Sequence, residues 1–157
     1  MSDRAVRPAR PAGESGPAEP GTTGRIRLLA AVAAVVTVGA GLGLRTVAAG
    51  DVAKYGGDAL YTLLILTLVV LTAPRMAPAR AAGTALAVSW AVELLQLTGL
   101  PAELSARSTA ARLVLGSTFN APDLFWYAVG AAAGWLVLRV SAGSVSHSVS
   151  GAHSGHV

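Results

Sequence analysis

Long apolar runs without charge constrain this chain most strongly. Residues 28–44, 59–73 and 124–138 contain no charged side chain, and the 22 residues between Arg80 and Glu103 contain only Glu93. A helix that crosses a bilayer needs about 17–25 predominantly apolar residues. The first run meets this requirement outright. The others meet it when Asp58, Glu93 and Asp123 lie inside the span or at its edge. The pattern predicts an all-α, four-helix transmembrane bundle, with helices at about 26–44, 57–73, 80–98 and 122–140.

The composition excludes several classes of protein. Only 13% of the 157 residues are charged, against about 25% in soluble domains, and residues 31–44 lack the polar face that a soluble helix needs. The absence of cysteine from the sequence excludes disulfides and thiol chemistry. A net charge of +4 would suggest nucleic acid in a soluble protein. Here we attribute it to membrane topology and expect no nucleic-acid partner.

Both ends of the sequence differ from the apolar middle. Residues 1–24 are rich in Pro, Gly, Ala and Arg, and residues 141–157 are rich in Ser, Gly and His. Such segments cannot bury enough apolar surface to offset the entropy of ordering. We therefore expect two disordered tails around a membrane domain at 25–140. The tail histidines lack the fixed geometry that a metal needs, so the sequence predicts no metal site; they are His147, His153 and His156.

The first apolar run has a second interpretation, a cleaved signal peptide. Basic residues precede the run, and Val47, Ala48 and Ala49 resemble a cleavage site. However, the run has 17 residues, which exceeds the usual apolar core of about 7–15 residues. This length favours a retained helix.

The distribution of Lys and Arg predicts the orientation, because basic residues gather on the cytoplasmic side of a membrane. With both termini cytoplasmic, eight of the 12 basic residues fall inside: Arg4, Arg7, Arg10, Arg25, Arg27, Arg75, Arg80 and Arg139. Four fall outside: Arg45, Lys54, Arg107 and Arg112. We expect a multi-pass protein of the bacterial plasma membrane with both termini in the cytoplasm.

This topology brings the polar residues of the apolar runs to one side of the membrane. Glu93 lies 13 residues after Arg80, about 20 Å along the helix, and therefore in the outer half of a core about 30 Å thick. Asp58 and Asp123 begin helices that enter from the outer side. The candidate binding residues are Asp58, Glu93, Gln96, Arg107, Arg112, Asp123 and Tyr127.

Structural explanations stay open for each of these features. Asp58 and Asp123 at helix starts favour the positive end of the helix dipole. Glu93 is costly inside a membrane, and its structural alternative is a buried contact with an arginine or glutamine that pins helices together. The glycine pairs at 39–43 and 130–134 allow close packing between helix backbones.

Several motifs in order resemble a known family. They are Lys54-Tyr55-Gly56-Gly57-Asp58-Ala59-Leu60-Tyr61, Glu93-Leu94-Leu95-Gln96-Leu97, Arg107-Ser108-Thr109, Arg112-Leu113-Val114-Leu115-Gly116, Phe119, Asp123-Leu124, Tyr127 and Gly130. Over about residues 26–140 the chain resembles the bacterial membrane family called domain of unknown function 2809 and, more distantly, VanZ-like membrane proteins. It departs from the family pattern at Tyr61, where Trp is common, and at Asn120 and Ala121, where an acid and an aromatic residue are usual.

The VanZ-like resemblance implies a function in the envelope, because VanZ-like proteins are linked to resistance to glycopeptide antibiotics. The first hypothesis is a protein without enzymatic activity or cofactor, which binds an envelope lipid, a lipid-linked cell-wall precursor or an amphiphilic drug. One alternative is an intramembrane enzyme that uses Glu93 and Asp123 as an acid/base pair, with catalytic residues otherwise unassigned. A third is a subunit of an ion or proton pathway. The oligomeric state is left open.

Overall fold

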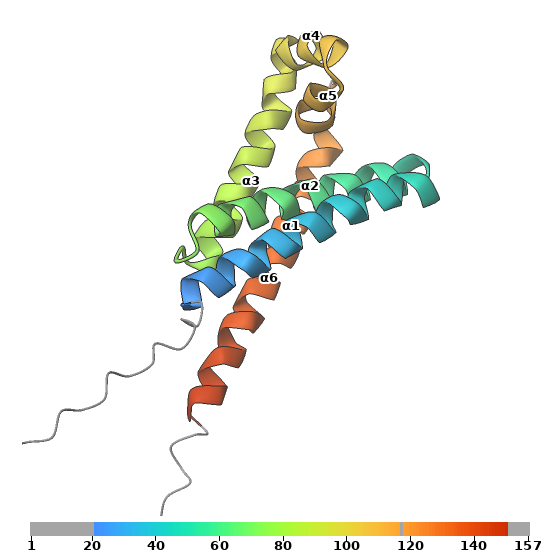
Figure 1. The fold of residues 1–157 in the computed structure, drawn as a ribbon. Coiled ribbons are helices and arrows are strands. Elements are labelled where there is room, and N and C mark those ends of the chain that lie inside the picture. Colours follow the sequence, from blue (N-terminus) through green and yellow to red (C-terminus); the bar gives the residue numbers. More distant parts are fainter. Residues whose placement is uncertain (1–20, 117, 151–157) are drawn as a thin grey trace, which may run out of the picture.

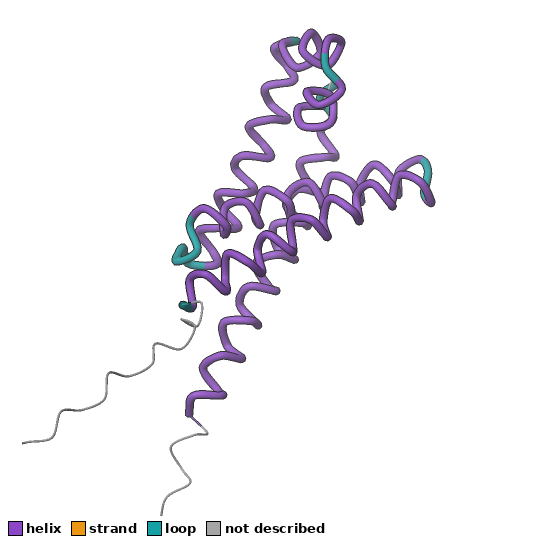
Figure 2. The backbone as a smooth tube through the Cα atoms, viewed as in Figure 1, coloured by secondary structure: helices purple, strands orange, loops and turns teal. Residues whose placement is uncertain are grey.

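The computed structural model describes residues 21–116 and 118–150, and all of their regular structure is helical (Figures 1 and 2). The predicted all-α fold is confirmed. Four helices are long: α1 (Thr22–Val47), α2 (Gly50–Thr72), α3 (Pro78–Leu95) and α6 (Ala121–Ser150). Three are short: the 3₁₀ turn η1 (Gln96–Thr98), α4 (Leu100–Arg107) and α5 (Thr109–Leu115).

The long helices match the four predicted spans. Each is long and apolar enough to cross a membrane, with mean hydropathies of 2.0, 1.6, 1.2 and 1.4 in chain order. Helix α1 buries only Ala30 among its residues, and its apolar side chains are exposed, with Val35 73% accessible. Such a surface suits hydrocarbon rather than water. These features indicate a multi-pass membrane protein.

Two helices differ most from their predicted bounds. Helix α2 begins at Gly50 rather than near residue 57, so the predicted loop at 45–56 shrinks to Ala48 and Ala49. Gly50 has φ +59°, a conformation that glycine adopts without steric cost, and it makes the tight turn possible. Close packing stabilises the extra helical turns, because a Cβ on Gly56 would overlap the Leu44 side chain. Helix α6 continues to Ser150, beyond the predicted end at 140.

The terminal tails fall largely outside the described residues, which leave out 1–20 and 151–157. The predicted loop at 99–121 is instead mostly helical, because it contains α4 and α5. The Ser108 hydroxyl caps α5 by accepting a hydrogen bond from the Ala111 amide at 3.3 Å. These two short helices cover the end of α3 and lead into α6 (Figure 1).

Helix α2 occupies the centre of the arrangement. It packs against α1, α3 and α6, and α3 packs against α6, whereas α1 packs mainly against α2. Small residues permit the close contacts: Ala81 and Ala85 are fully buried, and a Cβ on Gly130 would overlap the Ala59 carbonyl group. The prediction that the glycines at 39 and 43 pack closely against another helix is wrong within the described residues, because a Cβ at either position would meet nothing within 4 Å.

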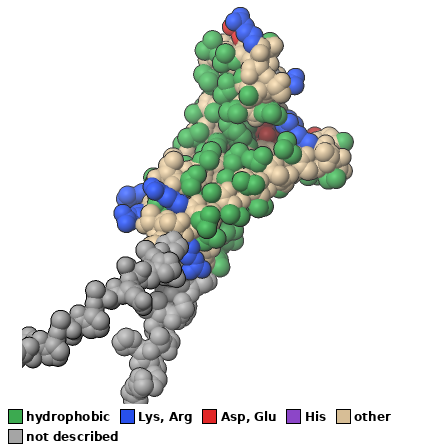
Figure 3. Space-filling view, viewed as in Figure 1, with side chains coloured by type: hydrophobic (Ala, Val, Ile, Leu, Met, Phe, Trp, Pro, Cys, Tyr) green, Lys and Arg blue, Asp and Glu red, His purple; other side chains and the backbone are tan. Residues whose placement is uncertain are grey.

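The two ends of the molecule differ in shape and charge. At one end the α1–α2 hairpin diverges from α3 and α6, so that the hairpin and the α3–α6 pair form an open angle (Figure 1). At the other end the start of α1, the turn between α2 and α3, and the last part of α6 lie on the same side. A cleft of about 700 Å³ at this second end is bordered by Arg27, Arg75 and Arg80, and basic side chains gather at this end in the space-filling view (Figure 3).

Candidate functional site

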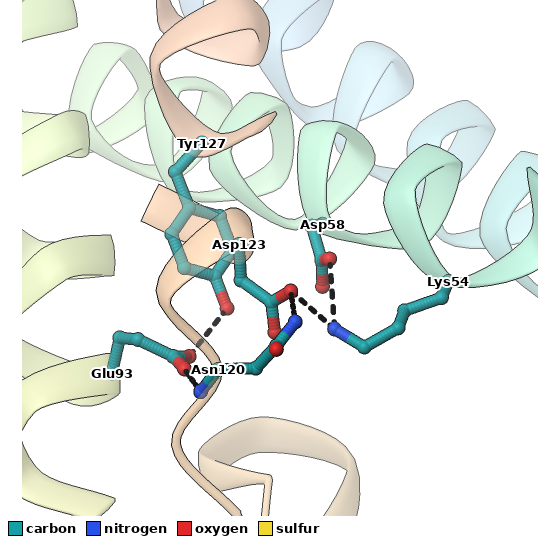
Figure 4. A network of polar contacts seen from close by, with 6 residues as sticks. All are labelled: Lys54, Asp58, Glu93, Asn120, Asp123 and Tyr127. Carbon is teal, nitrogen blue, oxygen red and sulfur yellow. Dashed lines mark hydrogen bonds and ion pairs between the residues drawn. The ribbon is translucent and has the colours of Figure 1, made fainter. Parts of the chain in front are cut away.

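A cluster of six polar side chains lies in the angle between the hairpin and the α3–α6 pair (Figure 4). We call it the polar cluster. Helix α2 provides two members, α3 one, α6 two, and the segment before α6 one. The members are Lys54, Asp58, Glu93, Asn120, Asp123 and Tyr127. Four of these were candidate binding residues from the sequence; Lys54 and Asn120 were not.

Glu93 is the most deeply buried member, with 1% of its surface exposed. Its Oε1 accepts a hydrogen bond from the Asn120 backbone amide at 2.6 Å, and its Oε2 accepts one from the Tyr127 hydroxyl at 3.0 Å. Hydrogen bonds to both oxygens compensate for the loss of water around the carboxyl group. Trp90, one turn earlier, donates its indole N–H to the Leu124 carbonyl at 3.0 Å. Glu93 therefore joins α3 to α6.

Asp123 is also buried and receives two donors. Its Oδ1 accepts hydrogen bonds from the Lys54 ammonium group and the Asn120 side-chain amide. Asn120 thus bridges two carboxyl groups, with its backbone amide on Glu93 and its side chain on Asp123. The departure from the family pattern has a structural use here, because an aspartate at position 120 would supply no side-chain donor.

Asp58 has fewer partners than the other two acids. The Lys54 ammonium lies 3.7 Å from Asp58 Oδ2, and that oxygen is buried without a hydrogen-bond donor. The helix dipole does not explain Asp58, because α2 begins eight residues earlier and Asp51 occupies its first turn. For Asp123 the dipole explanation stands, since this residue lies in the first turn of α6.

Gln96 lies next to the polar cluster, at the end of α3. Its Nε2 donates to the Leu115 carbonyl at 2.7 Å, while its Oε1 is buried and accepts no hydrogen bond. The amide reaches this carbonyl because Gly116 has no side chain; a Cβ there would lie 2.6 Å from Gln96 Nε2. Ser105 also donates to the Gly116 carbonyl, at 2.7 Å. These contacts tie α4 and α5 to α3.

The two outer-loop arginines do not reach Glu93. Within residues 21–116 and 118–141, Lys54 forms ion pairs with Asp58 and Asp123, and neither Arg107 nor Arg112 pairs with an acid of the polar cluster. Arg112 borders the cleft described below, but Arg107 does not. The expected arginine or glutamine partner of Glu93 is therefore replaced by a tyrosine and a backbone amide. Lys54 was missed because the prediction placed it in a loop; in a helix its spacing of four residues from Asp58 indicates a pair.

All members of the polar cluster except Asn120 border a cleft of about 760 Å³. The cleft lies between the α1–α2 hairpin and the residues of α3, α5 and α6, and acidic and basic atoms meet there in the space-filling view (Figure 3). Apolar side chains form the remaining walls: Val38, Leu42, Leu60, Leu64, Leu113 and Val114. Apolar walls with a few polar groups are typical of sites that bind small molecules or cofactors.

The side chains of Asp58, Glu93 and Asp123 are not arranged as the ligands of a metal ion. In the described part of the chain, no group of three or more His, Asp or Glu side chains could hold a metal ion. The oxygens of Glu93 and Asp123 accept hydrogen bonds from the protein instead. The arrangement is suited to accepting and donating hydrogen bonds rather than to coordinating a cation.

Comparison with known proteins gives one match. The family described as "Protein of unknown function (DUF2809)" matches residues 47–131, which is more than half of the chain and contains the whole polar cluster. No curated protein and no solved structure matches.

Proposed function

Because the chain belongs to the DUF2809 family of proteins of unknown function, we propose its function from the cleft itself: it binds the polar headgroup of an amphiphile at the membrane. One observation carries this proposal. The polar cluster, in which Glu93, Asp123 and Tyr127 are buried, borders a cleft of about 760 Å³ between helices that are long and apolar enough to span a bilayer. Polar side chains in hydrocarbon are costly unless they have partners, and a headgroup supplies such partners.

The walls of the cleft favour an amphiphile over a fully polar solute. Leu60 and Leu64 of α2 and Val38 and Leu42 of α1 border the cleft on the side of the hairpin. An acyl chain can lie against these residues while a headgroup contacts the polar cluster. The ligand class is an envelope lipid, a lipid-linked cell-wall precursor or an amphiphilic drug.

The contacts support binding better than acid/base catalysis. Glu93 and Asp123 accept hydrogen bonds from Asn120, Tyr127 and Lys54, so the protein itself uses both groups as acceptors. An ion pathway has weaker support still. It needs polar groups in the other half of the membrane, and the two candidates, Thr37 and Thr67, donate to carbonyl groups of their own helices.

Filling the cleft tests the proposal. Gly57 borders the cleft, and a Cβ there meets nothing within 4 Å, so Gly57→Leu adds bulk to the cleft without a backbone clash. Gly83→Leu is the matched control, because Gly83 is equally unobstructed and lies outside the cleft. We expect native mass spectrometry to find amphiphile retention reduced about tenfold or more in Gly57→Leu, equivalent to about 1.4 kcal/mol. Equal retention in the two variants would refute the proposal.

We also propose that the cleft faces the outer leaflet of a bacterial plasma membrane, on the basis of the Lys and Arg distribution. The sequence has no cysteine, so single cysteines report orientation without background. A membrane-impermeant maleimide should label Ala49→Cys, in the turn between α1 and α2, on intact cells or spheroplasts. It should label Ala77→Cys, in the turn between α2 and α3, only after permeabilisation; the reverse pattern would invert the orientation.

A further inference from the structure

The charged side chains around the cleft carry no net charge. Three are basic and three are acidic: Arg45, Lys54, Arg112, Asp58, Glu93 and Asp123. A ligand with a net charge would leave that charge without an opposite partner in a poorly solvated site, which is unfavourable. A neutral or zwitterionic ligand keeps the site balanced.

Not all of these groups are engaged with each other. Glu93, Asp123 and Lys54 are joined by the hydrogen bonds of the polar cluster. The guanidinium groups of Arg45 and Arg112 form no ion pair in the described part of the chain. The cleft therefore presents two available cations, one from the end of α1 and one from α5.

Two acceptors are also available. Asp58 Oδ2 and Gln96 Oε1 are buried and receive no hydrogen bond from the described residues. Both residues border the cleft. A buried acceptor without a donor is costly, and a ligand that brings N–H groups removes this cost.

We propose that the cleft binds a headgroup with both a phosphate and a primary ammonium group, that of an aminophospholipid. This inference rests on the proposed function, because it names the ligand of the same cleft. Arg45 and Arg112 contact the phosphate, for which the guanidinium group is geometrically suited. Asp58 and Gln96 accept hydrogen bonds from the ammonium group. An anionic headgroup with hydroxyl donors would leave one excess negative charge, and a quaternary ammonium group has no N–H to donate.

Lipids with matched acyl chains test the headgroup. The full chain is reconstituted in nanodiscs that contain equal amounts of phosphatidylethanolamine, phosphatidylcholine and phosphatidylglycerol, and retained lipid is measured by native mass spectrometry after release into detergent. We expect phosphatidylethanolamine to be retained about tenfold over phosphatidylcholine, which carries the same phosphate but no N–H donor. Asp58→Asn should reduce this preference several-fold.

The phosphate contact is tested separately. Arg112→Gln should weaken retention of phosphatidylethanolamine and phosphatidylcholine alike, while the matched Arg107→Gln, outside the cleft, should leave it at the wild-type level. A competition with soluble glycerophosphoethanolamine distinguishes a lipid from a free headgroup. Displacement of the lipid at equimolar competitor would overturn the lipid assignment in favour of a soluble zwitterion of the same chemistry.

Failure of this inference differs from failure of the proposed function. If all three lipids are retained equally, and Gly57→Leu loses all three, the cleft binds amphiphiles but does not select the ammonium headgroup. If Gly57→Leu retains lipid as well as Gly83→Leu does, the cleft does not bind lipid and both proposals are wrong.

Discussion

The two sides of the polar cluster contrast in how completely their groups are partnered. On the side of the α3–α6 contact, both oxygens of Glu93 accept hydrogen bonds. On the side of the α1–α2 hairpin, Asp58 Oδ2 accepts none. A buried carboxyl group is thus not in itself evidence of a binding site. Glu93, the most isolated charge in the sequence, borders the cleft, but both of its oxygens are already hydrogen-bonded within the protein.

The helix arrangement explains the contrast. Helices α3 and α6 approach closely along the turns that carry Trp90 and Glu93, so donors from Asn120 and Tyr127 reach the carboxyl group. Helix α2 also contacts α6 at this level, where Lys54 donates to Asp123 and the Tyr55 and Trp126 rings stack. No donor of the described residues lies within hydrogen-bonding distance of Asp58 Oδ2.

We expect the largest difference in unfolding free energy between substitutions of Glu93 and of Asp58. Glu93→Ala leaves two donors without an acceptor, at about 1–3 kcal/mol each, so we expect a loss of about 2–4 kcal/mol in the free energy of unfolding. Asp58→Ala removes a partly exposed ion pair and should cost about 1 kcal/mol or less. Reversible unfolding in mixed detergent micelles measures both. Similar losses in the two variants would abolish the distinction between the sides.

The next effect concerns the contact between α2 and α6. Gly130→Ala places a methyl group on the Ala59 carbonyl, a backbone group that cannot rotate away, and should destabilise the protein by about 1–3 kcal/mol. Gly41→Ala is the control, because a Cβ there meets nothing within 4 Å. The same unfolding assay should find Gly41→Ala neutral or slightly stabilised. Tolerance of alanine at 130 would mean that α2 and α6 are further apart than described.

A smaller effect is expected at the bridge between the carboxyl groups. Asn120→Asp keeps the backbone amide on Glu93 but replaces the donor to Asp123 with a third acid, and should cost about 1–2 kcal/mol in unfolding free energy. Asn120→Ala loses the same donor without the added charge, so it should cost less. If both variants cost the same, repulsion between the acids contributes nothing at this position.

Much of the fold could be predicted because its signals are local. The four spans follow from runs of apolar residues, and Pro122 in the first turn of α6 indicates the start of that helix. The positions of Asp58, Glu93 and Asp123 at one end follow from helix direction alone. The start of α2 could not be predicted, because residues 50–56 resemble a loop in composition and become helical through packing against Leu44.

Apolar length and helical rise depend only on the chain, so the residues alone predict four helices long enough to span a membrane and the polar residues that share one end. Which of these residues are partnered follows only from the packed helices. It depends on how α3 approaches α6 and on the path of the backbone before α6, which brings the Asn120 amide to Glu93. Hydrogen bonds form over a few tenths of an ångström, and residue spacing along one helix does not specify distances between helices at that scale.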